Sequence, residues 1–195
     1  MIIDELIFDR TTEDVQRVKE LKDRIMRNGL SSLTPAEKAE YLAGMKGAYN
    51  ASDMNRVGTA VAYIAARAIQ LPSDLEDYRE EREVSDDPMF ALPYDPDDVD
   101  VDPKTDWSVS DIPTLAQIKI YLANIENLRS LVTMPSGTPN TPTTLNGMTF
   151  VTANAMERIL WIVDQRLTEI ETEIKRLIDR VPPSYIFSGE LLSGE

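Results

Sequence analysis

Two stretches of the chain repeat each other 102 residues apart, and this repeat constrains the fold more than any other feature of the sequence. Ala51-Ser-Asp-Met-Asn-Arg-Val57 aligns with Ala153-Asn-Ala-Met-Glu-Arg-Ile159, and an Asp-x-x-Thr pair at residues 9–12 aligns with another at residues 111–114. Each half therefore predicts a helix, a polar connection and a longer second helix. Such repeats are typical of scaffolds that stack similar units, and less typical of sites assembled once for chemistry.

Capping signals define the helices of the first half. Thr11 or Thr12 can begin a helix that runs to about Arg27 and ends at Gly29. Thr34-Pro-Ala-Glu37 is a stronger signal, because it combines a capping box with proline at the first helical position. It predicts a short helix that ends near residues 44–47.

The next helix begins at Asn50 or Ser52, and Ser73-Asp-Leu-Glu76 could cap a further charged helix. Alanine is frequent in the longer of these two helices, which indicates close packing against a neighbour. Its apolar stripe consists of Met54, Val57, Val61, Ile64 and Ala68.

The second half begins with a capping box formed by Thr114 and Gln117, which predicts a helix to about Val132. Residues 133–150 are rich in Pro, Thr, Ser and Gly and are expected to form a loop. The last helix carries a heptad seam, which fits either packing inside its own bundle or a coiled coil between identical subunits. For the second alternative, the interface residues are Met156, Leu160, Val163, Leu167, Ile170, Ile174 and Leu177.

The net charge of −14 is concentrated in one segment. Residues 73–111 hold 15 acidic and 3 basic side chains, whereas residues 1–72 hold 10 of each and residues 112–195 hold 9 and 7. The acidic segment is expected to be a solvated, self-repelling linker. Neither flanking half has the basic face that nucleic-acid binding requires, so no nucleic-acid partner is expected.

Apolar residues inside the acidic segment and after the last helix are candidates for docking. Phe90 and Tyr94 are expected to lie across a groove, either on their own chain or on a partner. Tyr185 and Phe187 follow Pro182-Pro183 with alternating spacing, which suggests an extended segment that could add to the sheet edge of another chain.

The sequence gives little support for an enzyme, a cofactor or a metal site. It contains no histidine and no cysteine, which removes the commonest general base, the usual zinc ligands and the Ser-His and Cys-His nucleophile pairs. Asp98, Asp100 and Asp102 match the start of a calcium loop, but Pro103 stands at the position of the turn glycine and Val109 at that of the bidentate glutamate. No apolar run approaches 18 residues, and the apolar start of the sequence lacks a basic leader and contains acidic residues, so neither membrane insertion nor a secretory signal is expected.

Arg56 and Arg158 occupy equivalent positions in the repeat. Each could pair with an acidic residue of a neighbouring subunit, or with a local carboxylate such as Asp53 or Glu157. The aromatic residues of the second half are expected in the core rather than on a ligand-binding surface. They are Trp107, Tyr121, Phe150 and Trp161.

Several phrases of the sequence resemble small structural proteins from the tail modules of phages and prophages of Gram-positive, often gut, bacteria. In the first half they are Asp9-Arg-Thr-x-x-Asp-Val15, Leu30-Ser-Ser-Leu-Thr34 and Lys46-Gly-Ala-Tyr-Asn-Ala-Ser-Asp-Met-Asn-Arg-Val57; in the second, Ala153-Asn-Ala-Met-Glu-Arg-Ile-Leu160 and Phe187-Ser-Gly-Glu-Leu-Leu-Ser-Gly-Glu195. The resemblance does not extend to residues 84–106. It implies a virion component of the tail tip, baseplate or fibre attachment.

The sequence therefore predicts an all-α protein of two related helical units. These are an N-terminal unit (1–72), a linker (73–106), a C-terminal unit (107–181) and an extended tail (182–195). The resemblance implies a component of the virion tail or baseplate, made in the host cytoplasm. Together with the repeat and the heptad seam, it predicts an adaptor that binds other tail proteins and forms homo-oligomers. Alternatives are a head, neck or collar decoration protein, and a glycan-binding receptor module, although receptor-binding heads are usually β-rich.

Overall fold

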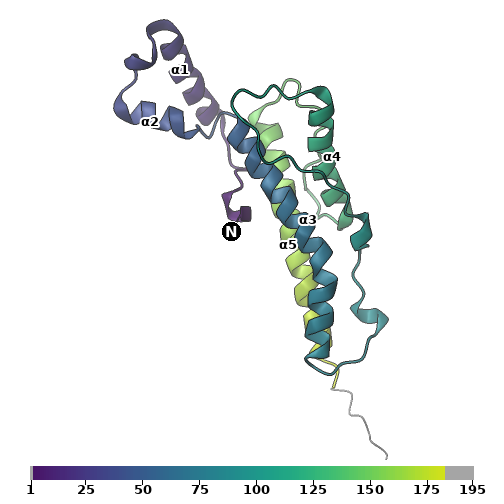
Figure 1. The fold of residues 1–195 in the computed structure, drawn as a ribbon. Helices are drawn as coiled ribbons and strands as arrows, with labels where there is room; N and C mark the ends of the chain where they lie inside the picture. Colours follow the sequence, from purple (N-terminus) through teal and green to yellow (C-terminus); the bar gives the residue numbers. More distant parts are fainter. Residues whose placement is uncertain (1, 183–195) are drawn as a thin grey trace, which may run out of the picture.

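The computed structural model describes residues 2–182, and within that range it contains helices and irregular segments but no strand, so the predicted all-α class is confirmed. Three helices form a bundle, and two others form an arm that projects from one end of it (Figure 1). The bundle contains α3 (Ala51–Glu80), α4 (Leu115–Leu131) and α5 (Phe150–Ile178), and the arm contains α1 (Thr12–Asn28) and α2 (Pro35–Ala43). Four 3-10 helices complete the described chain: η1 (Ile2–Glu5), η2 (Leu30–Ser32), η3 (Pro88–Phe90) and η4 (Pro96–Asp98).

The helices begin where the capping signals place them. The Thr34 hydroxyl accepts a hydrogen bond from the Glu37 N–H (3.2 Å), and the Glu37 carboxylate accepts one from the Thr34 N–H (2.9 Å). Thr11, Asn50 and Thr114 cap α1, α3 and α4 with the same reciprocal bonding, which satisfies backbone donors that have no partner within the helix.

The two long helices α3 and α5 lie side by side and run in the same direction. Near their first turns Arg56 bonds to Glu157, and near their last turns Tyr78 bonds to Asp179, and both pairs are 101 residues apart in sequence. Because the sequence separation of the paired residues is the same about six turns later, the two helices are parallel and stay in the same register.

A seam of apolar side chains in alternate steps of three and four is buried between α3 and α5, as in a left-handed coiled coil. Arg67 lies beside the seam on α3 and bonds to Asp164 (2.7 Å) and Glu171 (3.1 Å) on α5, which fixes the register of the two helices. On α3 the seam consists of Met54, Val57, Val61, Ile64, Ala68, Leu71 and Leu75.

Parallel helices in one chain require long return connections, and here these are mostly extended. A 30-residue helix such as α3 is about 45 Å long, so the chain must cover that distance again before α4 can begin beside it. Residues 81–106, which we call the strap, make this return along the bundle, and residues 132–149 make a second return from α4 to α5 (Figure 1). Bundles with short loops instead alternate up and down.

The structure differs from the expected boundary after residue 72, because α3 continues through Pro72 and includes residues 73–76, which the sequence suggests as the cap of a separate helix. Proline has no N–H to donate to the carbonyl four residues earlier, which here belongs to Ala68. The Tyr94 hydroxyl from the strap donates to that carbonyl (3.0 Å). The acidic segment is thus packed against the helices, and the main core contains residues from both sequence halves.

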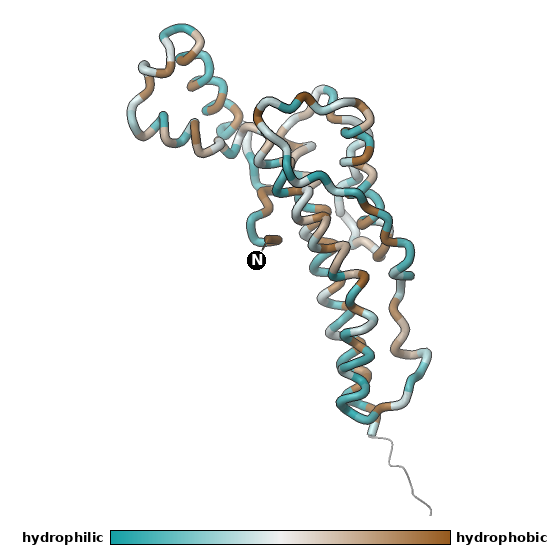
Figure 2. Tube along the Cα trace, in the orientation of Figure 1, coloured by the Kyte–Doolittle hydropathy of each residue, from teal (hydrophilic) through white to brown (hydrophobic). Residues whose placement is uncertain are grey.

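The arm has a small core of its own. Leu21 of α1 is fully buried beside Leu33 and Met45, and Arg24 bonds with both guanidinium ends to the Glu37 carboxylate of α2 (2.7 and 3.0 Å). Hydrophilic and hydrophobic residues alternate along its two helices (Figure 2). The arm is therefore a compact helical hairpin whose small core is separate from that of the bundle.

Candidate functional site: the junction between arm and bundle

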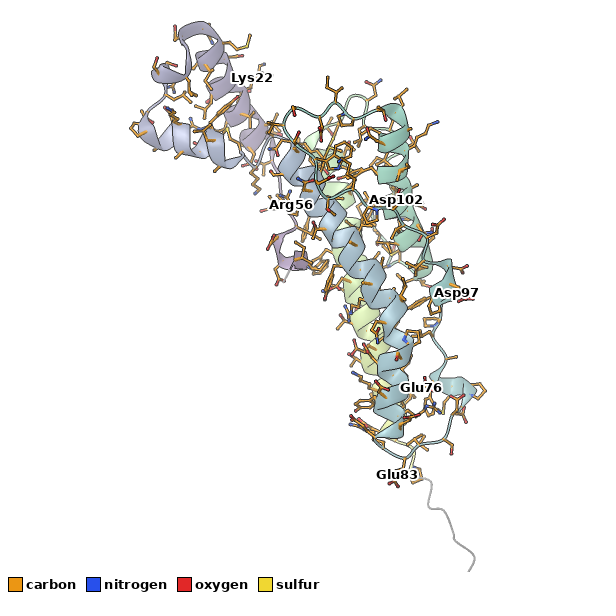
Figure 3. All side chains as sticks on the ribbon, viewed as in Figure 1. Lys22, Arg56, Glu76, Glu83, Asp97 and Asp102 are labelled. Atoms are coloured by element: carbon orange, nitrogen blue, oxygen red, sulfur yellow. The ribbon has the colours of Figure 1, made fainter. Side chains whose placement is uncertain are left out.

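Four charged side chains meet where the arm joins the bundle, at the level of Arg56 in Figure 3; three of them are buried and Arg56 is partly buried. Glu157 of α5 is 0% exposed and accepts hydrogen bonds from Arg10 (2.7 Å) and from Nε and Nη2 of Arg56 (2.9 and 3.0 Å). Asp53 of α3 accepts from the same two arginines. The two positive and two negative charges balance, which is the condition under which buried charges are tolerated.

Arg10 connects more parts of the molecule than any other member of this cluster. It is 3% exposed, and its Nε donates to the Lys46 carbonyl (3.0 Å) while Nη1 donates to the Ile7 carbonyl. Its Nη2 donates to Asp53 and to Glu157. Since residues 10 and 46 lie on the two segments that lead into and out of the arm, Arg10 fixes both segments to both long helices.

Two tyrosines complete the junction. The hydroxyl groups of Tyr49 and Tyr121 bond to each other (2.5 Å), the Arg10 guanidinium lies 5.6 Å from the centre of the Tyr49 ring, and burial raises the pKa of both tyrosines well above the usual range. Burial lowers the pKa of Arg56, but its bonds with Glu157 and Asp53 outweigh that effect and hold its pKa above the usual value. The two tyrosines therefore stay neutral and Arg56 stays charged near neutral pH.

The repeated arginines have different surroundings. Arg56 pairs with the local carboxylate Asp53, as one alternative predicted, and also reaches Glu157 on the parallel helix. Arg158 is exposed, and the structure assigns it no ion pair within residues 2–182. The repeat therefore preserves the residue type but not its role.

The heptad positions of α5 are packed inside the chain. Met156, Leu160, Val163 and Leu167 are fully buried against the other bundle helices, Ile174 is buried lower down, and Ile170 and Leu177 are partly buried. A contact between subunits through these residues would therefore require α5 to separate from α3.

Among the predicted docking residues, Phe90 and Tyr94 lie on their own chain. Phe90 is buried with Leu71, Leu75 and Ile178 in a second core at the lower end of the bundle, and Tyr94 packs beside the main core. Burial raises the pKa of Tyr94 to about 12. Tyr185 and Phe187 lie outside the described residues.

The strap is bound to α4 by two asparagines that sequence reasoning missed. Asn124 exchanges two hydrogen bonds with the backbone of Asp102 (2.9 and 3.0 Å), and Asn127 bonds to the backbone of Asp100 (3.2 Å) and Asp98 (3.3 Å). The amides therefore satisfy the backbone of the aspartates that resemble a calcium loop. Within residues 2–182, no group of three or more acidic side chains is arranged to hold a metal ion.

The expectation that the second-half aromatic residues form core is only partly met. Trp107 and Tyr121 are buried and Phe150 is half-buried, but Trp161 is exposed and packs against Phe8 with the ring centroids 5.7 Å apart. Sequence reasoning also missed the role of Arg10 at the junction. Its only signal in the sequence is a charged residue beside an apolar N-terminal stretch, and such a residue is usually solvent-exposed.

Comparison with family models, curated proteins and solved structures finds no match. No helix among residues 2–182 has the length and apolar character needed to cross a membrane.

Proposed function

We propose that the chain is a structural adaptor of a phage or prophage tail, at the baseplate or at a fibre attachment. It works by docking to neighbouring tail proteins and by self-association. One observation carries this proposal: a compact arm projects from a long bundle and is held at a fixed attachment by the charges around Arg10. A fixed projecting arm provides a surface whose position relative to the bundle is defined, as an adaptor between two neighbours requires.

The arm also carries exposed apolar side chains that its own core does not use. Met26 of α1 is 78% exposed and Leu42 of α2 is 67% exposed. Burial of exposed apolar side chains under a partner removes them from water, which lowers the free energy of the complex. They are the positions at which we expect a tail protein to bind the arm.

The experiment is to label the chain in purified particles and to co-purify it with the proteins of the same tail module. The double variant Met26→Ser/Leu42→Ser is expected to lose co-purification at least tenfold, whereas Met89→Ser, an exposed change on the strap, is expected to retain it. Absence of the chain from purified particles contradicts the proposal. A label on the head or neck would instead identify a decoration protein.

A further inference from the structure

The sequence contains two Asn-Gly pairs, and both are candidates for a spontaneous chemical change. They are Asn28-Gly29 and Asn146-Gly147. Asparagine is a thermolabile residue, because the backbone nitrogen of the next residue can attack its side-chain carbonyl carbon. Glycine in the next position favours this attack, since it has no Cβ beside the attacking nitrogen and restricts the backbone least. The environment of each pair then decides whether the reaction takes place.

The first pair is held at the end of a helix. Asn28 is the last residue of α1, and the Gly29 N–H donates to the Ile25 carbonyl (2.8 Å). The Gly29 nitrogen must lose its proton before it can act as a nucleophile, and this hydrogen bond opposes that loss. Reaction at Asn28 therefore requires the end of α1 to open first.

The second pair lies in an exposed turn on the return from α4 to α5. The Met148 N–H donates to the Leu145 carbonyl (3.1 Å), which places Asn146 and Gly147 at the two central positions of the turn. Gly147 has a φ of 68°, and a Cβ added there would meet no atom within 4 Å. Among residues 2–182, neither the Gly147 N–H nor the Asn146 carboxamide has a hydrogen-bond partner. The nucleophile and the group that it attacks are therefore both accessible to solvent.

We propose that Asn146 is a site of spontaneous deamidation, whereas the fold protects Asn28. A solvent base removes the Gly147 amide proton, the nitrogen attacks Cγ of Asn146, and Nδ2 leaves as ammonia after it takes up a proton from water. The resulting succinimide ring joins the Asn146 side chain to the backbone of Gly147. Water then opens the ring at either of its two C–N bonds, which leaves aspartate or its β-linked isomer, isoaspartate. Overall the reaction consumes one water and releases one ammonia, and it needs no oxidant or reductant.

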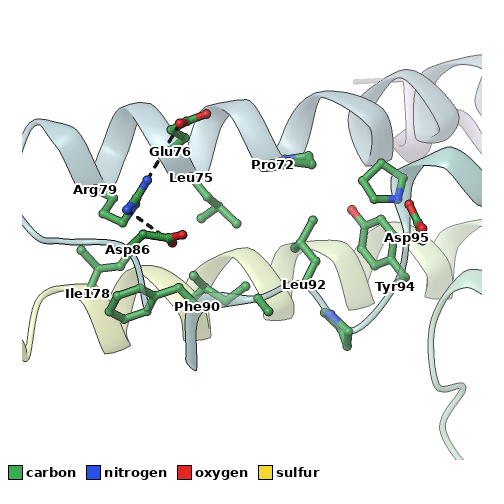
Figure 4. A pocket seen from close by; sticks show the side chains of 14 residues that line it. Pro72, Leu75, Glu76, Arg79, Asp86, Phe90, Leu92, Tyr94, Asp95 and Ile178 are labelled. Carbon is green, nitrogen blue, oxygen red and sulfur yellow. Dashed lines mark ion pairs between the residues drawn. The ribbon is translucent and has the colours of Figure 1, made fainter. Parts of the chain in front are cut away.

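The new carboxylate lies before the end of α5 that has no acidic side chain. The first turn of α5 contains none, whereas its last turns border a groove whose lining includes Glu76, Asp86 and Asp95 (Figure 4). Negative charge is favourable near the N-terminus of a helix and unfavourable near its C-terminus. The aspartate product therefore adds its charge on the side of α5 that tolerates it.

The isoaspartate product changes the backbone beside the junction. Met148 lines a cavity of about 340 Å³ together with Arg10 and Tyr49. Isoaspartate inserts one additional methylene group into the main chain at residue 146, so the turn that positions Met148 must change. Deamidation thus affects the place where the arm joins the bundle, and this inference does not depend on the proposed function.

Both sites can be measured in the same molecule. The full-length chain is incubated in mildly alkaline buffer made with heavy-oxygen water, and its peptides are analysed by mass spectrometry. In the folded chain we expect Asn146 to deamidate at least tenfold faster than Asn28, because only Asn28 must wait for local opening. In guanidinium chloride both environments are lost, so the two rates are expected to agree within threefold. Residue 146 should gain one heavy oxygen and be found as both aspartate and isoaspartate.

Asn146→Gln is the matched control, because its longer side chain would have to close a larger and less favourable ring. This variant should keep the helical circular dichroism of the unsubstituted chain and show no reaction at residue 146. Equal rates at Asn28 and Asn146 in the folded chain would overturn the proposal, as would an Asn146 that reacts only after denaturation. Aspartate formed without isoaspartate would also overturn it, since that product indicates direct hydrolysis of the side chain rather than ring closure.

Discussion

Helices α1 and α4 open the two halves of the repeat and each contain 17 residues, yet their surroundings differ. Both begin with a capping box. In α4 six residues are buried on the bundle, whereas in α1 only Leu21 is buried, within the arm. The difference shows that capping and length define a helix, but the width of its apolar face decides where the helix packs. The charged α1 needs only the small surface that α2 and η2 provide.

The largest expected effect is at the joint between these two regions. Glu157→Gln removes a negative charge from between the buried Arg10 and the partly buried Arg56 and leaves both with less compensation. We expect the free energy of unfolding, measured by urea denaturation, to fall by about 3–5 kcal/mol. Glu171→Gln removes a partly exposed carboxylate from the same helix and should cost less than about 1 kcal/mol. Similar losses in both variants would contradict the central role of the junction.

Truncations in the two helices should separate arm from bundle. Ile125→Ala in α4 creates a cavity in the main core and should lower the global free energy of unfolding by about 2–5 kcal/mol. Leu21→Ala in α1 affects the separate core of the arm, so hydrogen exchange should accelerate in residues 12–45 while amides of α3 and α5 keep their protection. Uniform acceleration throughout the chain in the second variant would mean that arm and bundle unfold as one unit.

A smaller effect is expected where the strap replaces α4 along the lower bundle. Tyr94→Phe leaves the Ala68 carbonyl without its donor, because Pro72 has no N–H to offer, and should cost about 1–3 kcal/mol in urea denaturation. In a Pro72→Ala background the restored backbone N–H can bond to that carbonyl, so the same change should cost clearly less. Equal costs in both backgrounds would show that the hydroxyl does not compensate for the proline.

The smallest expected effect is a difference in pH dependence between the capping boxes of α2 and α4. Hydrogen bonds from Arg24 and from the Thr34 backbone lower the pKa of Glu37 from 4.5 to about 2. Because the folded pKa is depressed, this carboxylate stabilises the arm above pH 4.5, and the stabilisation is lost as the pH falls toward 2. The box of α4 uses Gln117, which does not titrate in this range.

NMR titration should therefore show α2 amides shifting with the Glu37 carboxyl while the first turn of α4 stays unchanged. In the Arg24→Gln variant, the pKa of Glu37 should rise toward 4.5. A pKa unaffected by this substitution would mean that the ion pair is not the main cause.

Local features of the fold could be predicted from the sequence, whereas long-range ones could not. The boxes at Thr34 and Thr114 and the stripe on α3 identify helices because their signals lie within a few residues. The heptad seam indicated an apolar partner for α5 but not which helix supplies it. The continuation of α3 through Pro72 depends on Tyr94, and the junction depends on Arg10 meeting a residue 147 positions away. Neither pairing leaves a local pattern.

The parallel arrangement of α3 and α5 also determines the order in which the molecule can form during synthesis. The arm contains only neighbouring segments, so its contacts become available early. The seam of α3 has no partner until α5 has been synthesised about a hundred residues later. Arg10 can pair with Glu157 only after a further 147 residues have been synthesised. Domains whose contacts are distant in sequence fold slowly and expose apolar surface meanwhile. During synthesis the arm can therefore form before the bundle does.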